Sequence, residues 1–494
     1  MAHCHAGATN FLPSTPCRAT QQAPMTSPLS GFVDRALDRV TRAFRDAASG
    51  AREVVGAPLR PDLPEDDIPR LRRQIDACLD GPGGDTGARA RAAQLGRTYL
   101  ALSAEGRRKL LSILAREHGP DPAAISAAMV RWQEATDDRE RMAAETALRA
   151  ALESPAAQLL ARFTSLPEGV KFVVDLRAEL LRMGHTDPAV ARLAQDLRRL
   201  LSAWFDVGFL DLRHIDWSAP AALLEKLIAY EAVHAIGSWS DLKNRLDSDR
   251  RCFAFFHPRM PDEPLIFVEV ALVDGLAGSV QRLLDESAPT HNTSAADTAI
   301  FYSISNCQQG LAGVSFGNYL IKRVAEELKR ELPKLSMFAT LSPIPGFRAW
   351  LDATLDAEGD GALTPAETET LAAICDSARG AAAVRLLLEN QDWPNVRAHE
   401  HALKPILMRL CARYLVRERR GDRALDRVAH FHLGNGARIE CLNWLGDPSP
   451  NGLKQACGMM VNYRYKLEDV DANHEAYADG KIVASNDVKR LAKA

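Results

Sequence analysis

The chain has 494 residues, 46% of them hydrophobic and 25% charged, and its formal net charge is −3. These values are ordinary for globular proteins and exclude a fibrous or wholly disordered chain. The near-zero charge gives no general attraction to nucleic acid or an anionic membrane, and no apolar run reaches the roughly 20 residues of a membrane helix, so neither partner is expected. Nine cysteines without a C-x-x-C pair favour a reducing compartment over a disulfide framework.

Residues 1–33 are predicted to be a disordered leader. They contain no Asp or Glu, one Arg and several Pro, Ser and Thr, without the continuous apolar segment of a secretory signal. Met25 lies within this segment, so both Met1 and Met25 are candidates for the first residue of the protein.

Residues 34–205 are predicted to form a helical bundle. Apolar residues recur at intervals of three and four with charges between them, for example along 107–118, 122–152 and 188–204. Clusters of Gly and Pro separate these stretches, and strand-like alternation is nearly absent. Because no combination of residues in this part indicates catalysis, we expect it to be an oligomerisation domain.

Residues 206–494 are predicted to form an α/β domain with long helical insertions. Short runs of β-branched and aromatic residues indicate strands, and an amphipathic helix is expected at 318–331. The expected strands are 252–256, 265–272, 298–304, 337–341 and 437–444. The chain as a whole is therefore expected to be of the α+β class, with an all-α part before the part that contains the sheet.

A glycine-rich segment, 308–318, joins the strand at 298–304 to the following helix. Its three glycines allow several backbone N–H groups to point outward together, and with the helix N-terminus they form a cradle for phosphate. Lys322 and Arg323 add positive charge one turn into the helix. The spacing matches neither a Walker A loop nor a dinucleotide-binding loop, and an ordinary glycine-rich turn is the alternative.

Two further segments carry residue types that suit catalysis. Ser342 stands in a loop whose prolines restrict the backbone and could hold its hydroxyl in place, although Ser before Pro also starts ordinary turns. His430 and His432 are expected on the same side of an extended segment, where one of them could act as acid or base or simply precede a turn. No Cys or His cluster has the spacing of a zinc site, so no metal is expected.

The segment 356–367 matches an EF-hand calcium loop at several positions, including the first Asp and the last Glu. It departs at the third position, where Glu stands in place of Asp or Asn, and the sequence offers no second loop with which it could pair. We expect a solvated helix–loop–helix insertion here, with calcium binding as the alternative.

Eight segments of the second half together resemble the malonyl-CoA decarboxylase family. They are HPRMPDEPL (257–265), FYSIS (301–305), QQGL (308–311), LIKRV (320–324), LSPIPGF (341–347), FHLGNGA (431–437), IECLNW (439–444) and MVNYRY (460–465). The resemblance covers nearly all of the second half, whereas the helical first half is similar to the family's N-terminal assembly domain only loosely.

The resemblance implies a GNAT-like (acyl-CoA N-acyltransferase) catalytic domain at 206–494 and homotetramers assembled through the helical domain at 34–205. It places the catalytic serine, histidine and tyrosine on Ser342, His432 and Tyr465. Substrate binding falls on Ser342 and His432, and on a CoA-binding loop made of Ala312, Gly313, Val314, Ser315, Phe316, Gly317 and Asn318. It implies no metal and no organic prosthetic group.

The implied reaction converts malonyl-CoA to acetyl-CoA and CO₂, with His432 protonating the thioester enolate and Ser342 engaging the malonyl carboxylate. The alternatives are an acyl-CoA N-acyltransferase on the same fold and a helical scaffold with an inert α/β domain. The chain ends in Leu-Ala-Lys-Ala instead of the peroxisomal Ser-Lys-Leu. Together with the lack of a clear targeting signal, this suggests a bacterial cytoplasmic enzyme.

Overall fold

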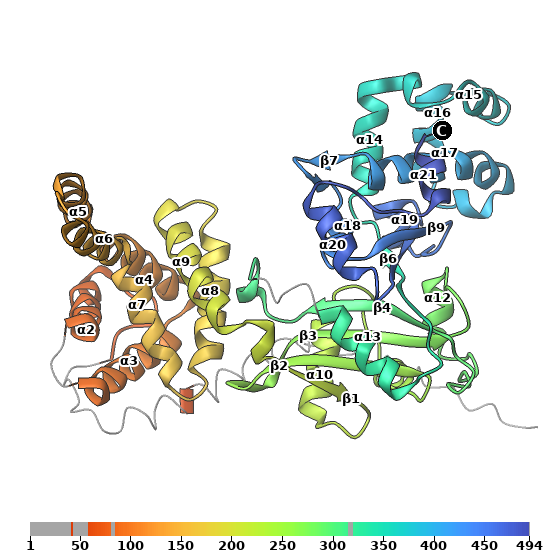
Figure 1. The fold of residues 1–494 in the computed structure, drawn as a ribbon. Helices are drawn as coiled ribbons and strands as arrows, with labels where there is room; N and C mark the ends of the chain where they lie inside the picture. Colours follow the sequence, from red (N-terminus) through yellow and green to blue (C-terminus); the bar gives the residue numbers. More distant parts are fainter. Residues whose placement is uncertain (1–40, 43–57, 81–83, 315–319, 494) are drawn as a thin grey trace, which may run out of the picture.

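The computed structural model describes residues 41–42, 58–80, 84–314 and 320–493. Within them, a helical N-terminal region is followed by a region built around a mixed β-sheet, and further helices pack at one end of that sheet (Figure 1). This arrangement confirms the expected fold class. The predicted leader at 1–33 lies outside the described residues.

The described N-terminal region is made of helices whose starts follow from the sequence. Asp121 and Asp187 each precede a Pro, and their carboxylates accept hydrogen bonds from Ala123 N–H at 2.9 Å and Ala189 N–H at 3.0 Å. Pro suits the first turn because its missing N–H has no partner to lose there. The helices are α2 (Ile68–Asp80), α3 (Gly84–Ala101), α4 (Ala104–Glu117), α5 (Pro122–Glu134), α6 (Asp138–Leu152), α7 (Pro155–Arg162), α8 (Gly169–Met183) and α9 (Pro188–Trp204).

The helical pattern along 122–152 divides into α5 and α6. Asp137 caps the second helix by accepting a hydrogen bond from Glu140 N–H at 2.7 Å, and the Glu140 carboxylate accepts one from Thr136 N–H at 2.9 Å. These two hydrogen bonds start a new helix where periodicity alone shows no break. The two helices pack against each other as a hairpin that extends away from the rest of the region (Figure 1).

The sheet has eight strands in the order β1-β2-β3-β4-β5-β10-β6, and β9 pairs with β10 as well. Neighbouring strands are antiparallel except β4 and β5, which are parallel. The strands are β1 (Asp211–Ile215), β2 (Arg250–His257), β3 (Met260–Val273), β4 (Thr298–Asn306), β5 (Met337–Thr340), β6 (Ser342–Pro343), β9 (Arg438–Asn443) and β10 (Met460–Tyr465). All five expected strands are confirmed, whereas β1, β6 and β10 were not expected.

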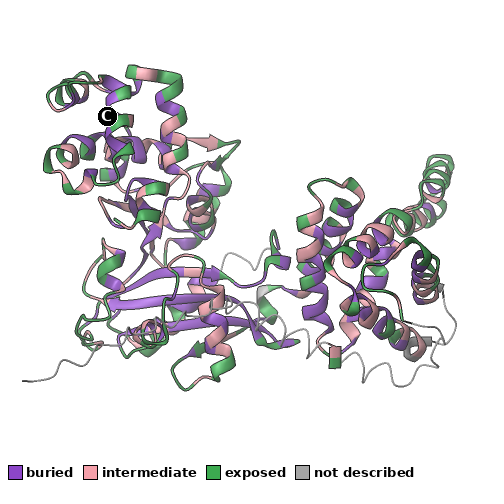
Figure 2. Cartoon of the chain, turned by 180° about the vertical axis from the view of Figure 1, so that it is seen from behind, coloured by how far each residue is buried: buried purple, intermediate pink, exposed green. Residues whose placement is uncertain are grey.

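The parallel pair β4–β5 requires a crossover, and the glycine-rich segment with α13 (Leu320–Glu331) provides it. Over its described part, α13 confirms the helix expected at 318–331. β3 and β4 are buried on both faces (Figure 2), which explains why their sequences are largely apolar instead of alternating; the polar residues Glu269, Ser303 and Ser305 within them are buried as well.

Helices cover the faces and one end of the sheet. On one face, Leu224 and Leu227 of α10 (Ala221–Tyr230) pack with Phe256 and Phe267 of the sheet. The helices that follow β6 are the expected insertions: α14 (Phe347–Glu358), α15 (Pro365–Ala372), α16 (Gly380–Glu389), α17 (Arg397–Val416), α18 (Arg427–Gly434), α19 (Pro450–Ala456), α20 (Val470–Ala478) and α21 (Asn486–Lys493). Among the helices that the structure describes, none has both the length and the apolar character needed to cross a bilayer.

Candidate active site

Ser342 and His432 meet at the end of the sheet. Oγ of Ser342 and Nε2 of His432 are 3.1 Å apart, although 90 positions separate the two residues in the sequence. Ser342 begins β6, where it pairs with Val461 of β10, and it is only 5% exposed. The proline-restricted loop expected around Ser342 is therefore a short strand, and pairing with β10 holds the hydroxyl in place.

His432 lies on the last turn of α18, not on an extended segment as expected. The helix begins at its Asp426 cap, whose carboxylate accepts hydrogen bonds from Val428 and Ala429 N–H at 2.9 Å each. Two residues along an α-helix differ by about 200° in direction, so His430 and His432 point to different sides. Nδ1 of His430 instead contacts the Tyr477 hydroxyl at 2.8 Å. The expectation that both histidines share a side is wrong, and only His432 reaches Ser342.

Tyr465 completes a line of three side chains. Its hydroxyl lies 2.8 Å from Nδ1 of His432, on the opposite side of the imidazole from Ser342. Tyr465 is the last residue of β10, and it pairs with Phe338 of β5. The structure thus brings together the three residues predicted to be catalytic, from β6, α18 and β10.

Two polar residues that the sequence analysis did not single out support this line. The Ser342 hydroxyl donates a hydrogen bond to Oγ1 of Thr340 at 2.8 Å, and the Asn462 side-chain amide donates one to the Thr340 carbonyl oxygen at 2.8 Å. Thr340 and Asn462 are fully buried. The signal that could have revealed them is a polar residue within an otherwise apolar strand, because buried polar groups are almost always hydrogen-bonded.

The hydrogen-bond network and burial set the protonation state of His432. Because the Ser342 hydroxyl donates to Thr340, its oxygen accepts from His432, which places the imidazole hydrogen on Nε2 and lets Nδ1 accept from Tyr465. Burial lowers the pKa of His432 to about 3, since no counter-ion offsets the loss of hydration. Burial also raises the pKa of Tyr465 well above its ordinary value. Both groups are therefore neutral at pH 7.

Ser342 and His432 open onto a cavity of about 450 Å³. Its lining includes the ends of β4 and β6 and the first two turns of α18. Arg427, at the start of α18, is the one guanidinium among the described lining residues, and it is exposed. The cavity lining thus includes a buried hydroxyl, a neutral imidazole, a solvated cation and the carboxylate of Asp447, which accepts a hydrogen bond from Gln281 at 2.7 Å. The hydroxyl, the imidazole and the cation suit an anionic substrate undergoing proton transfer.

The loop expected to bind CoA is described only at its start. Ala312, Gly313 and Val314 are described, whereas Ser315, Phe316, Gly317 and Asn318 lie outside the described residues. Gly313 has φ of +74°, a conformation that favours glycine. The two cations expected to add charge to the loop have contacts elsewhere: Lys322 Nζ lies 3.4 Å from the Asp471 carboxylate, and Arg323 donates to the Leu210 carbonyl at 3.1 Å.

The EF-hand-like segment is not a calcium loop. Its first residue, Asp356, lies inside α14 and forms an ion pair with Arg385, and its last residue, Glu367, pairs with Arg409 at 2.6 Å. Glu367 also closes a capping box at the start of α15. The carboxylates thus serve helix packing, and no group of His, Cys, Asp or Glu within the described ranges is arranged to hold a metal.

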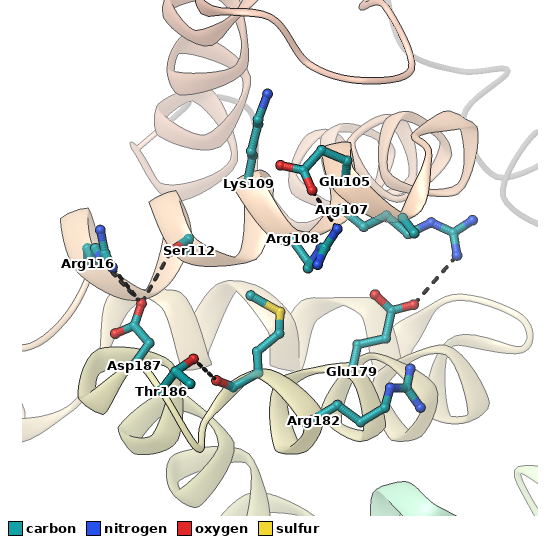
Figure 3. Close-up of a pocket in the computed structure, with 12 residues that line it drawn as sticks. Glu105, Arg107, Arg108, Lys109, Ser112, Arg116, Glu179, Arg182, Thr186 and Asp187 are labelled. Carbon is teal, nitrogen blue, oxygen red and sulfur yellow. Dashed lines mark hydrogen bonds and ion pairs between the residues drawn. The ribbon is translucent and has the colours of Figure 1, made fainter.

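A larger cavity, of about 820 Å³, lies in the helical region between α4 and α8 (Figure 3). Its charged side chains largely neutralise one another: Arg108 pairs with Glu105 at 2.5 Å and Arg116 with Asp187 at 2.9 Å. None of its lining residues is a predicted site residue. The smaller cavity at Ser342 and His432 is therefore the candidate active site.

Comparisons with known proteins match nearly the whole described chain. The family model described as malonyl-CoA decarboxylase C-terminal domain matches residues 208–494, and the model of the N-terminal domain matches 118–205. The chain is 39% identical to the mitochondrial malonyl-CoA decarboxylase of Anser anser anser over 416 residues, which cover 81% of this chain and 82% of the relative. It is 36% identical to that of Mus musculus over 467 residues, 89% of this chain and 90% of the relative.

Solved structures show the same similarity. The crystal structure of malonyl-CoA decarboxylase from Rhodopseudomonas palustris superposes with a TM-score of 0.77 at 40% sequence identity, over 85% of this chain and 99% of that one. The structure from Agrobacterium vitis gives a TM-score of 0.77 at 42% identity, with the same coverage.

Proposed function

Since the chain belongs to the malonyl-CoA decarboxylase family, we propose that it converts malonyl-CoA to acetyl-CoA and CO₂ with Ser342, His432 and Tyr465 as catalytic residues. The observation that carries this proposal is the hydrogen-bonded line from Ser342 through His432 to Tyr465, whose first two members border the cavity. The enzyme is accordingly a carboxy-lyase, which breaks one carbon–carbon bond and places one proton on carbon.

The substrate supplies its own electron sink, because the malonyl carboxylate is β to the thioester carbonyl. When CO₂ leaves, the electron pair of the broken bond moves toward that carbonyl and gives a thioester enolate. The protein must hold the carboxylate out of the thioester plane, stabilise the enolate oxygen and deliver a proton to the α-carbon. None of these tasks requires a metal or an organic prosthetic group, so the proposal includes neither.

When the substrate binds, the Ser342 hydroxyl turns away from Thr340 and donates to the malonyl carboxylate, and His432 donates the proton. In the free protein, burial keeps His432 neutral, with its pKa lowered to about 3. A carboxylate bound beside the imidazole favours the charged form, so substrate binding draws a proton from solvent onto His432. Loss of CO₂ removes that carboxylate, and the imidazolium then passes its proton to the α-carbon and becomes neutral again. Tyr465 contacts Nδ1 in both forms, because its hydroxyl donates to the neutral ring and accepts from the imidazolium, and so it fixes the direction of the ring.

The loop of Ala312, Gly313, Val314, Ser315, Phe316, Gly317 and Asn318 binds the phosphates of CoA through its backbone N–H groups. This loop joins β4 to α13, so a bound anion also interacts with the N-terminus of that helix. The loop follows the carboxyl end of β4, and Ser342 follows the carboxyl end of β5. Because these two strands are parallel neighbours, the loop and Ser342 follow strand ends at the same edge of the sheet.

The direct test is turnover by the purified protein in the presence of a chelator. Malonyl-CoA labelled in its free carboxyl should release one labelled CO₂ for each acetyl-CoA formed. Acetyl-CoA consumption in the presence of amines, without CO₂ release from malonyl-CoA, would instead indicate an N-acyltransferase on the same fold. No turnover with intact CoA binding would indicate an inert α/β domain on a helical scaffold.

We further propose that the helical domain at 34–205 assembles the protein into a homotetramer, with the GNAT-like domain at 206–494 carrying the chemistry. The support is the α5–α6 hairpin, which exposes apolar side chains that a solvated helix pair would not carry. Trp132 is 43% exposed and Met142 is 68% exposed, and Met129, Val130 and Leu152 are exposed on the same two helices. A second copy of the chain is the partner that would cover them.

For the location we propose the bacterial cytoplasm. The support is the similarity to proteins of two bacteria, at 40% and 42% identity, although the goose and mouse relatives carry the name mitochondrial. Immunodetection in fractions of the source cells tests this, and recovery in a membrane-enclosed organelle would contradict it.

A further inference from the structure

The helical region packs directly on the start of the loop proposed to bind CoA. A Cβ built at Gly310 would lie 1.7 Å from the Val174 carbonyl oxygen of α8, so only glycine fits there. Arg177 of α8, 2% exposed, donates hydrogen bonds to the carbonyl oxygens of Gly310 and Ala312, the second at 2.9 Å. The chain between β4 and the loop is therefore packed against α8 and hydrogen-bonded to it.

A second arginine of the helical region lies beside Gly313, in the described start of the loop. The side chain of Arg198, on α9, lies beside Gly313: a Cβ built there would be 3.7 Å from its Cδ and 3.8 Å from its Nη1. Arg198 is exposed, and its guanidinium forms no hydrogen bond or ion pair with any residue of the described ranges. The next residue, Arg199, differs in this respect, because it lies 3.6 Å from the Asp196 carboxylate.

The two arginines concentrate positive charge at the loop. Burial and the nearby charge of Arg198 lower the pKa of Arg177. The Arg177 guanidinium is already occupied by backbone carbonyls, the third being that of Ala194 at 3.0 Å, whereas Arg198 keeps its donors for another group. A planar guanidinium presents paired N–H donors that match phosphate oxygens, and the adjacent backbone favours anions as well.

We propose that Arg198 binds a phosphate of CoA, so that the helical region completes the substrate-binding site as well as serving assembly. This inference rests on the proposed function, because it takes the loop after Ala312 as the CoA-binding loop. The phosphate is either part of the pyrophosphate or the 3′-phosphate of the ribose, and substrates that lack one of these groups distinguish them.

The test compares Arg198→Ala with the matched control Arg199→Ala, which removes the same charge one residue away. For malonyl-CoA, Arg198→Ala should raise KM roughly tenfold and leave kcat within about twofold, the effect of losing a charged hydrogen bond to the bound substrate. Arg199→Ala should behave as the wild type. Malonyl-S-N-acetylcysteamine lacks both phosphates, so both variants should use it equally well.

Malonyl-dephospho-CoA decides between the two phosphates: an unchanged Arg198 effect assigns the pyrophosphate, and loss of the effect assigns the 3′-phosphate. Equal KM values for both variants and the wild type would overturn the inference, as would an equal loss on the short thioester. A wild-type protein without CO₂ release would overturn the proposed function instead. In that case calorimetric titration with CoA still tests Arg198, with a roughly tenfold weaker Kd expected for Arg198→Ala.

Discussion

The imidazole of His432 is held from both sides, with Ser342 Oγ 3.1 Å from Nε2 and the Tyr465 hydroxyl 2.8 Å from Nδ1. The ring also stacks on Tyr463, with the two ring centres 4.5 Å apart and the planes inclined by 22°. An imidazole fixed in this way has one orientation and, in the free protein, one tautomer. This geometry is what a residue needs if it is to deliver a proton to one carbon atom.

Replacement of His432 by Asn should abolish most of the activity. We expect kcat to fall about 10²–10⁴-fold, the usual effect of losing an acid or base group. His430→Asn is the matched control, because that histidine lies on the same helix but contacts Tyr477 instead of Ser342. Steady-state CO₂ release from malonyl-CoA measures both. A His432→Asn enzyme within about threefold of the wild type would show that the proton donor is misassigned.

Replacement of Tyr465 by Phe should lower kcat and leave KM for malonyl-CoA nearly unchanged. The substitution keeps the ring in the sheet but removes the hydroxyl that holds Nδ1 of His432. We expect a decrease of about tenfold, because one neutral hydrogen bond contributes roughly 1 kcal/mol and the Nδ1 atom is left buried without a partner. Tyr477→Phe, which removes the hydroxyl beside His430, is the comparison. Equal effects of the two variants would argue against a specific role for Tyr465.

His432 should make the fold less stable in acid. Its folded pKa of about 3 lies below the ordinary value of 6.5, so between these values the unfolded chain binds more protons than the folded one. Titration of His432 therefore leaves the free energy of unfolding unchanged above pH 6.5. As the pH falls from 6.5 toward 3, it lowers that free energy by about 1.4 kcal/mol per pH unit.

Urea unfolding of the wild type and of His432→Asn at pH 7, 6 and 5 measures this contribution. The free energy of unfolding of the variant should depend less steeply on pH, by about one proton between pH 6 and pH 5. Parallel pH profiles would mean that the imidazole is not buried in its neutral form.

Arg177→Met should destabilise the protein by about 3 kcal/mol. The substitution leaves the buried Gly310 carbonyl oxygen without its donor and removes the hydrogen bonds to the carbonyl oxygens of Ala194 and Ala312. Arg182→Met is the control, because Arg182 is on the same helix and is exposed. Chemical denaturation measures both. A free energy of unfolding for Arg177→Met equal to that of Arg182→Met would show that the contact between α8 and the loop is not structural.

Charges on the α5–α6 hairpin should break up the proposed tetramer. Trp132→Glu or Met142→Glu places a carboxylate on the apolar surface that a second copy would cover, and the mass in solution should fall below that of a tetramer. Phe209→Glu is the control, because Phe209 is 61% exposed outside the hairpin. Light scattering after size-exclusion chromatography gives the masses. A wild-type monomer, or a tetramer that survives both substitutions, would rule out this surface.

The elements of the sheet were predictable because burial on both faces leaves a local signal. β3 and β4 appear in the sequence as largely apolar runs, and α13 as an amphipathic pattern after a glycine-rich turn. β10 was not found, because Asn462 and Arg464 interrupt its apolar pattern and its pairing partners are distant in the chain. The extended conformation expected for 430–432 was wrong because the Asp426 cap outweighs the local alternation.

The sequence by itself determined the α+β order of the chain, five of the eight strands of the sheet and, through the family's motifs, which serine, histidine and tyrosine to examine. Only the tertiary structure decided that α18 directs His432 and not His430 to Ser342, that Thr340 and Asn462 fix the serine, and that Arg198 lies over Gly313. The physical reason is that side-chain direction and burial depend on contacts between segments far apart in the chain. A histidine with a pKa of about 3 differs from any other only by what surrounds it.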